Sequence, residues 1–136
     1  MDFRALEKYQ PQLRAILRIV VSLLFMEHGL AKLLHFPVPQ PGAPDPLPPL
    51  LLAAAIIEIL AGALVAIGLF TRLAAFIAAG EMAIAYFMFH APQSFWPIVN
   101  MGEGAILYCF VFLYLAAAGP GAWSVDGMRT KSAPVT

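Results

Sequence analysis

The sequence predicts an all-α fold, a transmembrane four-helix bundle. Of its 136 residues, 61% are apolar and only 12% are charged, and the mean hydropathy is +0.80. Soluble domains are nearer half apolar and one quarter charged. The apolar residues fall into four runs, each close to the roughly 20 residues that one membrane span requires. The runs lack the two-residue alternation of barrel strands, so helices are the predicted spanning form.

The charges and the cysteine content exclude several other classes of protein. Eight basic and eight acidic residues cancel, so no charge excess favours nucleic acid as a partner. The single cysteine excludes an intrachain disulfide, a CxxC redox pair and any multi-cysteine metal site. The composition also excludes a disordered chain and a small secreted scaffold. The predicted partner is the lipid bilayer, and the predicted organisation is one four-span membrane domain over residues 1–136.

The first two predicted spans are separated by a proline-rich loop. The first span covers residues 13–36 and ends at Pro37. A signal peptide is the alternative, but the run is long and no small-residue cleavage pattern follows it. The second span covers residues 50–70 and ends at Thr71-Arg72, which leaves only a tight turn before the third.

The third and fourth predicted spans are separated by an aromatic segment broken by prolines, which suits a membrane interface. The third span covers residues 73–90 and ends just before Pro92. The fourth covers residues 98–118 and ends at a Gly-Pro-Gly sequence that breaks helices. A tail, residues 119–136, follows, and its polar part, residues 122–136, is expected to be frayed.

The lysines and arginines predict the orientation. An even number of spans places both termini on one side of the membrane. Basic residues precede the first span, occur in the tail and include Arg72 in the second turn, whereas the first and third loops contain none. The positive-inside rule therefore predicts that both termini, the tail and Arg72 are cytoplasmic.

Each predicted span contains one glutamate, and these are Glu27, Glu58, Glu81 and Glu103. A charge at the bilayer centre costs about 2.5–3.5 kcal/mol, so four cost on the order of 10 kcal/mol unless they are neutral, paired or hydrated. At about 1.5 Å per residue, the first three lie roughly 13 Å below the outer ends of their spans. Glu103 lies nearer the outer surface. The sequence therefore predicts a polar layer in the outer half or middle of the bundle.

Helical phase separates these glutamates by face. At about 100° per residue, Glu58 and Glu81 share their faces with small residues, which let helices approach closely. Glu103 shares its face with Asn100, Leu107, Phe110 and Tyr114. We therefore expect Glu58, Glu81 and Glu103 to face inward. Glu27 lies on the opposite side of the first helix from Arg18, so it is a candidate contact in a homo-oligomer.

The polar layer has three interpretations. It could be a buried ion-pair network, in which Arg18 forms a structural ion pair with a glutamate and Lys32 lies near the depth of Glu103. It could be a polar site for a small ligand or for proton transfer, because ionisable residues inside membranes are functional candidates by default. It could be a metal site, but the chain lacks the Glu-x-x-His pairs of carboxylate-bridged di-iron bundles, so no metal ligands are predicted.

Several motifs, in order along residues 14–127, resemble those of the DoxX family. They are Arg18 with Glu27-His28-Gly29-Leu30-Ala31-Lys32-Leu33, Glu58-x-x-x-Gly62 with Gly68-Leu69-Phe70-Thr71-Arg72, Phe95-Trp96-Pro97-x-x-Asn100-x-Gly102-Glu103, and Gly119-Pro120-Gly121-x-x-Ser124-x-Asp126. The family comprises small four-helix integral membrane proteins, mostly bacterial. It is named for its similarity to a membrane subunit of an archaeal thiosulfate:quinone oxidoreductase. The resemblance implies a multi-pass protein of the bacterial inner (cytoplasmic) membrane.

The resemblance also implies a function, that of a membrane component of a redox system linked to the quinone pool. Quinone would be its cofactor, and a redox protein would be its partner. The positions that match the family pattern are His28, Lys32, Glu58, Arg72, Asn100 and Glu103. Glu81 is outside that pattern, so its role depends on its place in the third span alone.

Quinone reduction needs two electrons and two protons, and the sequence contains no flavin motif, iron–sulfur ligand set or dithiol. Electrons would then come from a partner, which leaves open whether the chain is a subunit of a quinone-linked oxidoreductase. The expected proton-relaying catalytic residues are Glu58, Glu81 and Glu103. The expected ligand-binding residues are His28, Lys32, Arg72, Asn100, Tyr108 and Trp96. Trp96 could instead anchor the chain at the interface. The alternatives are a non-enzymatic small-solute transporter or scaffold and a metal-dependent membrane enzyme.

Overall fold

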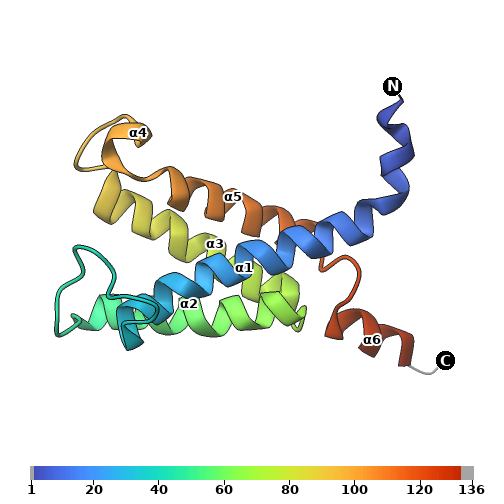
Figure 1. Ribbon diagram of the computed structural model, residues 1–136, viewed down its shortest axis with the longest axis horizontal. Coiled ribbons are helices and arrows are strands. Elements are labelled where there is room, and N and C mark those ends of the chain that lie inside the picture. Colours follow the sequence, from blue (N-terminus) through green and yellow to red (C-terminus); the bar gives the residue numbers. More distant parts are fainter. Residues whose placement is uncertain (1, 133–136) are drawn as a thin grey trace.

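The computed structural model describes residues 2–132, which form helices and loops without a strand in that range (Figure 1). A 3₁₀ helix, η1 (Phe3–Tyr9), leads into α1, and one π-helical turn, η2 (Tyr86–His90), extends α3. The α-helices are α1 (Gln10–Leu34), α2 (Pro49–Ile67), α3 (Thr71–Ala85), α4 (Pro97–Asn100), α5 (Glu103–Ala118) and α6 (Val125–Ser132). The predicted all-α class is confirmed.

The four longest helices form two packed pairs. Helix α1 lies along α2, and α3 lies along α5. The pairs are joined mainly through α2 and α3, whereas α1 and α5 touch at few points. Figure 1 shows that the pairs diverge toward the end of the molecule that carries α4 and the loop after α1. This divergence leaves room for a cavity at that end.

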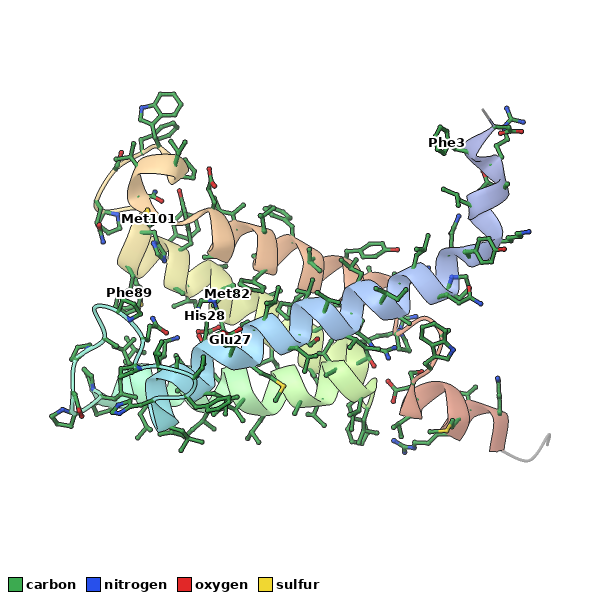
Figure 2. All side chains as sticks on the ribbon, in the orientation of Figure 1. Phe3, Glu27, His28, Met82, Phe89 and Met101 are labelled. Carbon is green, nitrogen blue, oxygen red and sulfur yellow. The ribbon has the colours of Figure 1, made fainter. Side chains whose placement is uncertain are left out.

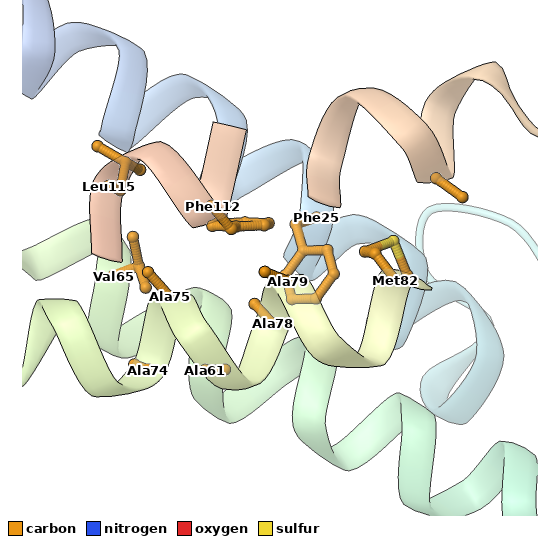
Figure 3. Close-up of a cluster of buried hydrophobic side chains, with 11 residues drawn as sticks. Phe25, Ala61, Val65, Ala74, Ala75, Ala78, Ala79, Met82, Phe112 and Leu115 are labelled. Atoms are coloured by element: carbon orange, nitrogen blue, oxygen red, sulfur yellow. The ribbon is translucent and has the colours of Figure 1, made fainter. Parts of the chain in front are cut away.

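An apolar core holds the pairs together where they lie closest (Figure 3). Phe25 of α1 and Phe112 of α5 are both fully buried, and their ring centroids lie 4.8 Å apart in an edge-to-face arrangement. Alanines supply most of the α3 surface in the core, including Ala75 and Ala78. Burial of one such phenylalanine contributes about 1.5–3 kcal/mol. The small α3 residues therefore allow close helix contact, while the two aromatic rings fill the space between the pairs.

Two glycines set the distance between α1 and α2. A Cβ atom on Gly29 would lie 2.7 Å from the carbonyl oxygen of Ala55, and one on Gly62 would lie 2.4 Å from Cγ of Met26. Both positions are too close for any side chain. The close crossing places Gly29 beside Glu58, whose Cβ would lie 2.9 Å from a Cβ at position 29. This contact fixes the part of α1 that carries the candidate site.

The first three helices differ at their ends from the predicted spans. Helix α1 stops at Leu34, because His35 has a positive φ of 54°. Helix α2 stops at Ile67, because Gly68 adopts a φ of 72°. The α-helical part of α3 ends at Ala85, and the chain continues to His90 as the π-helical turn η2.

The predicted fourth span, residues 98–118, is broken in two. The short α4 ends at Asn100, and α5 begins at Glu103. Met101, between them, has a φ of 61°, which no continuous α-helix contains. The Asn100 side chain stabilises the break, because its Oδ1 accepts a hydrogen bond of 2.8 Å from the backbone N–H of Gly102.

The C-terminal segment, expected to be frayed, is instead attached to the bundle over the described residues 119–132. Arg18 is fully buried and donates hydrogen bonds to the carbonyl oxygens of Pro120, Ala122 and Trp123, at 2.5, 3.1 and 2.8 Å. The carboxylate of Asp126 accepts hydrogen bonds from Phe70 and Thr71 at the start of α3. The segment therefore closes the narrow end of the bundle.

Two helical segments are long and apolar enough to cross a membrane, Pro49–Ile67 and Thr71–His90. Helix α5 is apolar but has only 16 residues. Helix α1 has 25 residues and carries charged side chains along its length. Length and composition therefore identify two candidate spans among the described residues, in place of the four that the sequence predicts.

Candidate functional site

A cavity of about 590 Å³ lies between the diverging helix pairs. Its polar lining comes from three helices, with His28 and Lys32 on α1, Glu58 on α2 and Glu81 on α3. Tyr108 of α5 contributes a fourth wall. The cavity thus brings together five residues that the sequence singled out for catalysis or ligand binding.

The centre of the site is an ion pair between α1 and α2. The Nζ atom of Lys32 lies 2.5 Å from Oε1 of Glu58. The exposed fraction of the side chain is 11% for Lys32 and 1% for Glu58. A carboxylate so deeply buried requires a compensating charge, because leaving water costs several kcal/mol. Lys32 therefore pairs with Glu58, and the depth match to Glu103 does not lead to a contact.

Two carboxylate oxygens in the cavity have unused hydrogen-bonding capacity. The Oε2 atoms of Glu58 and Glu81 are buried and have no hydrogen-bond partner among the described residues. Both glutamates line the same cavity. Buried polar atoms are nearly always satisfied by protein, water or ligand. Their arrangement can therefore accept hydrogen bonds from a guest molecule or hold an exchangeable proton.

His28 and Tyr108 form the side of the cavity toward α1 and α5. Their ring centroids lie 5.8 Å apart, with the rings nearly perpendicular. A second pocket, of about 310 Å³, lies on the outer side of these rings and is also lined by Glu27. In Figure 2, Glu27 and His28 lie side by side along α1, with Met82 of the cavity wall above them. Glu27 is exposed, as its helical phase predicted, and it does not line the larger cavity.

Glu103 does not line this cavity. It is exposed on the first turn of α5, although its neighbours Gly104 and Ala105 belong to the cavity wall. The residues predicted to share its face, such as Leu107 and Phe110, are also exposed. The prediction that these residues share one face of α5 was therefore right, but this face points outward and not into the bundle. Asn100 is separated from it by the break at residue 101.

Arg18 and Arg72, the two arginines that the sequence singled out, lie away from the cavity, near the opposite end of the bundle. Arg72 donates hydrogen bonds to the carbonyl oxygens of Ala116 and Ala117, at the C-terminal end of α5. Arg18 binds carbonyl oxygens of the C-terminal segment, in place of the carboxylate partner that the sequence predicted. Carbonyl groups at a helix end carry partial negative charge and attract cations. Both residues thus attach segments of the chain to each other.

Asn100 and Trp96 also lie outside the cavity lining. Asn100 is 1% exposed, and its amide nitrogen donates to the hydroxyl of Tyr86 and the carbonyl of Ser94. Together with the bond from Gly102, these contacts occupy both ends of the amide and hold the turn before α5. Trp96 is 64% exposed and packs its ring against Phe95, a placement that suits the interface-anchor alternative.

The sequence-based reasoning missed the polar residues that loops bring to the cavity. Gln40 comes from the proline-rich loop, Gln93 follows η2, and His90 ends the π-helical turn. His90 also places Nδ1 2.9 Å from the carbonyl oxygen of Asn100. Loops have no hydrophobic periodicity, so the sequence offered no signal for the return of the first loop over the cavity. A π-turn is a frequent feature of functional sites, but its location has no simple sequence signature.

Within residues 2–132, no group of three His, Cys, Asp or Glu side chains is placed so that it could hold a metal ion. The polar lining of the cavity consists of one cation, two carboxyl groups, two imidazoles, a phenol and two side-chain amides, surrounded by apolar side chains. Such a set can bind a small polar group and exchange protons with it.

The outer surface of the bundle is strongly apolar. Large exposed side chains occur on every long helix, for example Leu60 on α2, Phe76 on α3 and Phe110 on α5, each at least 60% exposed. Monomeric soluble proteins rarely expose continuous apolar surface of this kind. The fold and the cavity together define a helical membrane protein with an internal polar site.

Comparison with known proteins identifies the family. The DoxX family model matches residues 13–91. A relative from Haemophilus influenzae, described as an uncharacterized protein, is 48% identical over 130 residues, covering 93% of this chain and 97% of the relative. No solved structure matches the chain. The chain belongs to the DoxX family.

Two further relatives carry membrane names. The inner membrane protein YqjF of Escherichia coli is 29% identical over 129 residues, covering 85% of this chain and 91% of the relative. The uncharacterized membrane protein Rv3486 of Mycobacterium tuberculosis is 26% identical over 135 residues, covering 86% of this chain and 81% of the relative. By homology this chain is an inner membrane protein, in agreement with its apolar helices.

Proposed function

We propose that the chain is a four-span protein of the bacterial inner membrane whose cavity binds the polar head of a small membrane-soluble ligand and exchanges protons with it. The buried Lys32–Glu58 pair, with a free carboxylate oxygen beside it, is the observation that carries this proposal. Because Glu58 also lines the cavity, its Oε2 can accept a hydrogen bond from a bound ligand. The cavity volume, about 590 Å³, lies within the range of small-molecule sites.

The positions of the charges on α1 support the proposed four-span topology. Arg18 is fully buried against carbonyl oxygens, and Lys32 is paired with Glu58, so neither of these two charges faces lipid. Glu27 is exposed, but it lines the smaller pocket beside the first loop. Helix α1 can then cross the membrane beside α2 and α3, and α5 together with α4 supplies the fourth crossing. The positive-inside rule, applied to Arg72 and the basic residues of both termini, places the termini in the cytoplasm.

The ligand class that fits best is a quinone. A quinone head presents carbonyl oxygens that need hydrogen-bond donors, which Lys32, His28 and Tyr108 can supply. Its reduced form presents hydroxyl groups, which the free Oε2 atoms of Glu58 and Glu81 can accept. The site therefore offers donors for one redox state and acceptors for the other.

Charge balance explains how the site could move protons. Lys32 neutralises one carboxylate, so a single proton shared by Glu58 and Glu81 makes the site neutral overall. Quinone reduction consumes two protons with two electrons. The carboxyl pair would deliver its one shared proton to a quinone oxygen, and the second proton would follow after the pair takes up another proton from water. The electrons would come from a redox partner protein, and the chain would act as the quinone-binding component of that system.

Binding of a tail-less benzoquinone to the full-length protein in lipid nanodiscs tests the proposal. We expect Lys32→Met and Glu58→Gln each to weaken binding by about tenfold to a hundredfold, because each removes a hydrogen bond to a charged group. Glu7→Gln, at an exposed position of η1, is the matched control and should bind as the unmodified protein does. Equal affinity in all of these proteins, or no binding in any of them, would contradict the proposal. Glu103→Gln tests the proton-relay role that the sequence predicted for Glu103. Because Glu103 is exposed and lies outside the cavity, this variant should bind as the unmodified protein does.

A further inference from the structure

A groove of about 370 Å³ runs along the outer side of the α2–α3 contact. It extends on α3 from Phe76 to Phe89, which at about 1.5 Å per residue is roughly 20 Å. That length is about two thirds of the roughly 30 Å hydrocarbon thickness of a bilayer. The groove is therefore a long, narrow depression on a face of the bundle that meets lipid.

Small residues form part of the groove lining. They include Ala53 and Ala54 of α2 and Gly80 of α3. A Cβ atom at Gly80 would have no other atom within 4 Å, so this glycine borders open space and does not serve a close helix crossing. Larger apolar side chains such as Ile57, Phe76 and Ile84 also line it.

The groove and the polar cavity share a wall. Five residues line both, and they are Leu51, Ala54, Glu81, Ala85 and Phe89. Glu81 is the one ionisable residue along the groove, and its Oε2 is one of the buried oxygens without a partner in the described structure. The apolar groove therefore leads to the carboxyl group that borders the proposed ligand site.

We propose that the α2–α3 groove holds the single apolar tail of a lipid-soluble ligand whose polar head passes Glu81 into the cavity. This inference rests on the function proposed for the cavity and adds the class of ligand, a small polar head on one long hydrocarbon or isoprenoid chain. It also adds the route, which is lateral access from the bilayer between α2 and α3.

The dimensions favour a tail over a second protein chain. The groove volume of about 370 Å³ along roughly 20 Å suits one narrow chain. An α-helix with side chains is about 10–12 Å across. Continuity with the polar cavity at Glu81, midway along the groove, gives a place suited to a head group, which a second copy of the bundle would not use.

A photoreactive quinone tests the inference on the full-length protein in nanodiscs. The probe is a benzoquinone with a decyl tail that ends in a diazirine, and labelled residues are identified by mass spectrometry. We expect labels concentrated along α2 and α3 in the groove. Gly80→Leu should reduce binding and labelling about tenfold, which corresponds to the loss of roughly two buried methylene groups. Leucine is a better helix former than glycine, so this change should not unfold α3.

Two controls make the result specific to the groove. Ala117→Leu adds a similar side chain at an exposed position of α5 outside both pockets and should leave labelling unchanged. The tail-less benzoquinone should bind the Gly80→Leu variant and the unmodified protein equally, since it has no tail to displace.

The outcomes separate failure of this inference from failure of the proposed function. Labels spread evenly over exposed residues of α5, such as Leu107 and Phe110, would show ordinary lipid contact and overturn the groove assignment. Labels between two copies of the chain would assign the groove to an oligomer contact and also overturn it. If the tail-less quinone binds but Gly80→Leu does not change labelling by the tailed probe, the groove assignment is rejected and the proposed function is retained. If labelling depends on Gly80 but the tail-less quinone does not bind, quinone is rejected as the head group of the ligand and the tail site in the groove is retained.

Discussion

Lys32 and Glu58 are 26 positions apart in the chain, yet Nζ of the lysine lies 2.5 Å from Oε1 of the glutamate inside the bundle. The pair joins α1 to α2 at the point where the two helix pairs begin to diverge. It therefore links the stability of the bundle to the chemistry of the cavity.

Removal of one partner of this pair should destabilise the protein more than removal of both. Lys32→Met leaves Glu58, which is 1% exposed, without a compensating charge, and the expected loss is about 3–5 kcal/mol. The double variant Lys32→Met/Glu58→Leu should recover most of that loss, because an apolar pair has no charge to desolvate. Thermal unfolding in detergent measures both. Lys8→Met, at an exposed site, is the control, and a double variant no more stable than Lys32→Met would contradict the prediction.

The close crossing of α1 and α2 predicts that Gly29 tolerates no side chain. Gly29→Ala would place a Cβ 2.7 Å from the carbonyl oxygen of Ala55 and should cost about 1–3 kcal/mol through forced displacement of the helices. Gly80→Ala, which meets open space, should stabilise α3 by up to about 1 kcal/mol through helix propensity. Unfolding free energies of the two variants should thus change in opposite directions. A shared direction would rule out the close crossing as the cause.

Attachment of the C-terminal segment should depend on the planar guanidinium group of Arg18. Arg18→Lys retains the charge but cannot donate to the three carbonyl oxygens of Pro120, Ala122 and Trp123 from one rigid group. The expected result is faster tryptic cleavage at Arg129 and Lys131, together with a lower unfolding temperature. Arg4→Lys, in the exposed η1, is the matched control. Unchanged cleavage in Arg18→Lys would show that other contacts hold the segment.

The contact between Asp126 and α3 predicts a dependence on pH. Partial burial alone would raise the pKa of Asp126, but hydrogen bonds from Thr71 and Phe70 and the charge of Arg129 outweigh it, and the pKa lies below its usual range. A pKa lowered by folding means that the contact stabilises the protein fully above the unfolded value, about 3.9. The stabilisation is lost as the pH falls from there through the lower folded value.

Comparison of Asp126→Asn with the unmodified protein tests this sign. The unmodified protein should be more stable near pH 7, and the difference in unfolding temperature should shrink as the pH falls below about 4. Asp45→Asn, in the exposed first loop, should show no such pattern. A difference that stays constant from pH 7 to pH 3 would exclude the Asp126 carboxylate as the cause.

Composition and periodicity were sufficient to predict an all-α chain and to single out most of the ionisable residues that line the cavity. The phase argument correctly placed Glu58 inward and Glu27 outward, because angular position along one continuous helix follows from residue spacing alone. The same argument failed for Glu103. It assumed a continuous helix over residues 98–118, and the break at Met101 and Gly102 interrupts the phase between Asn100 and Glu103.

Sequence spacing specifies which residues share one face of a helix, but it does not specify which other helix lies opposite that face. The pairing of Lys32 with Glu58, and of Arg18 with backbone carbonyls, depends on how α1 crosses α2 and the C-terminal segment. The cavity likewise arises because the backbones of α1 and α5 come close at few points and the first loop returns over the gap. These relationships involve residues far apart in the chain, so only the packing of the complete bundle could decide them.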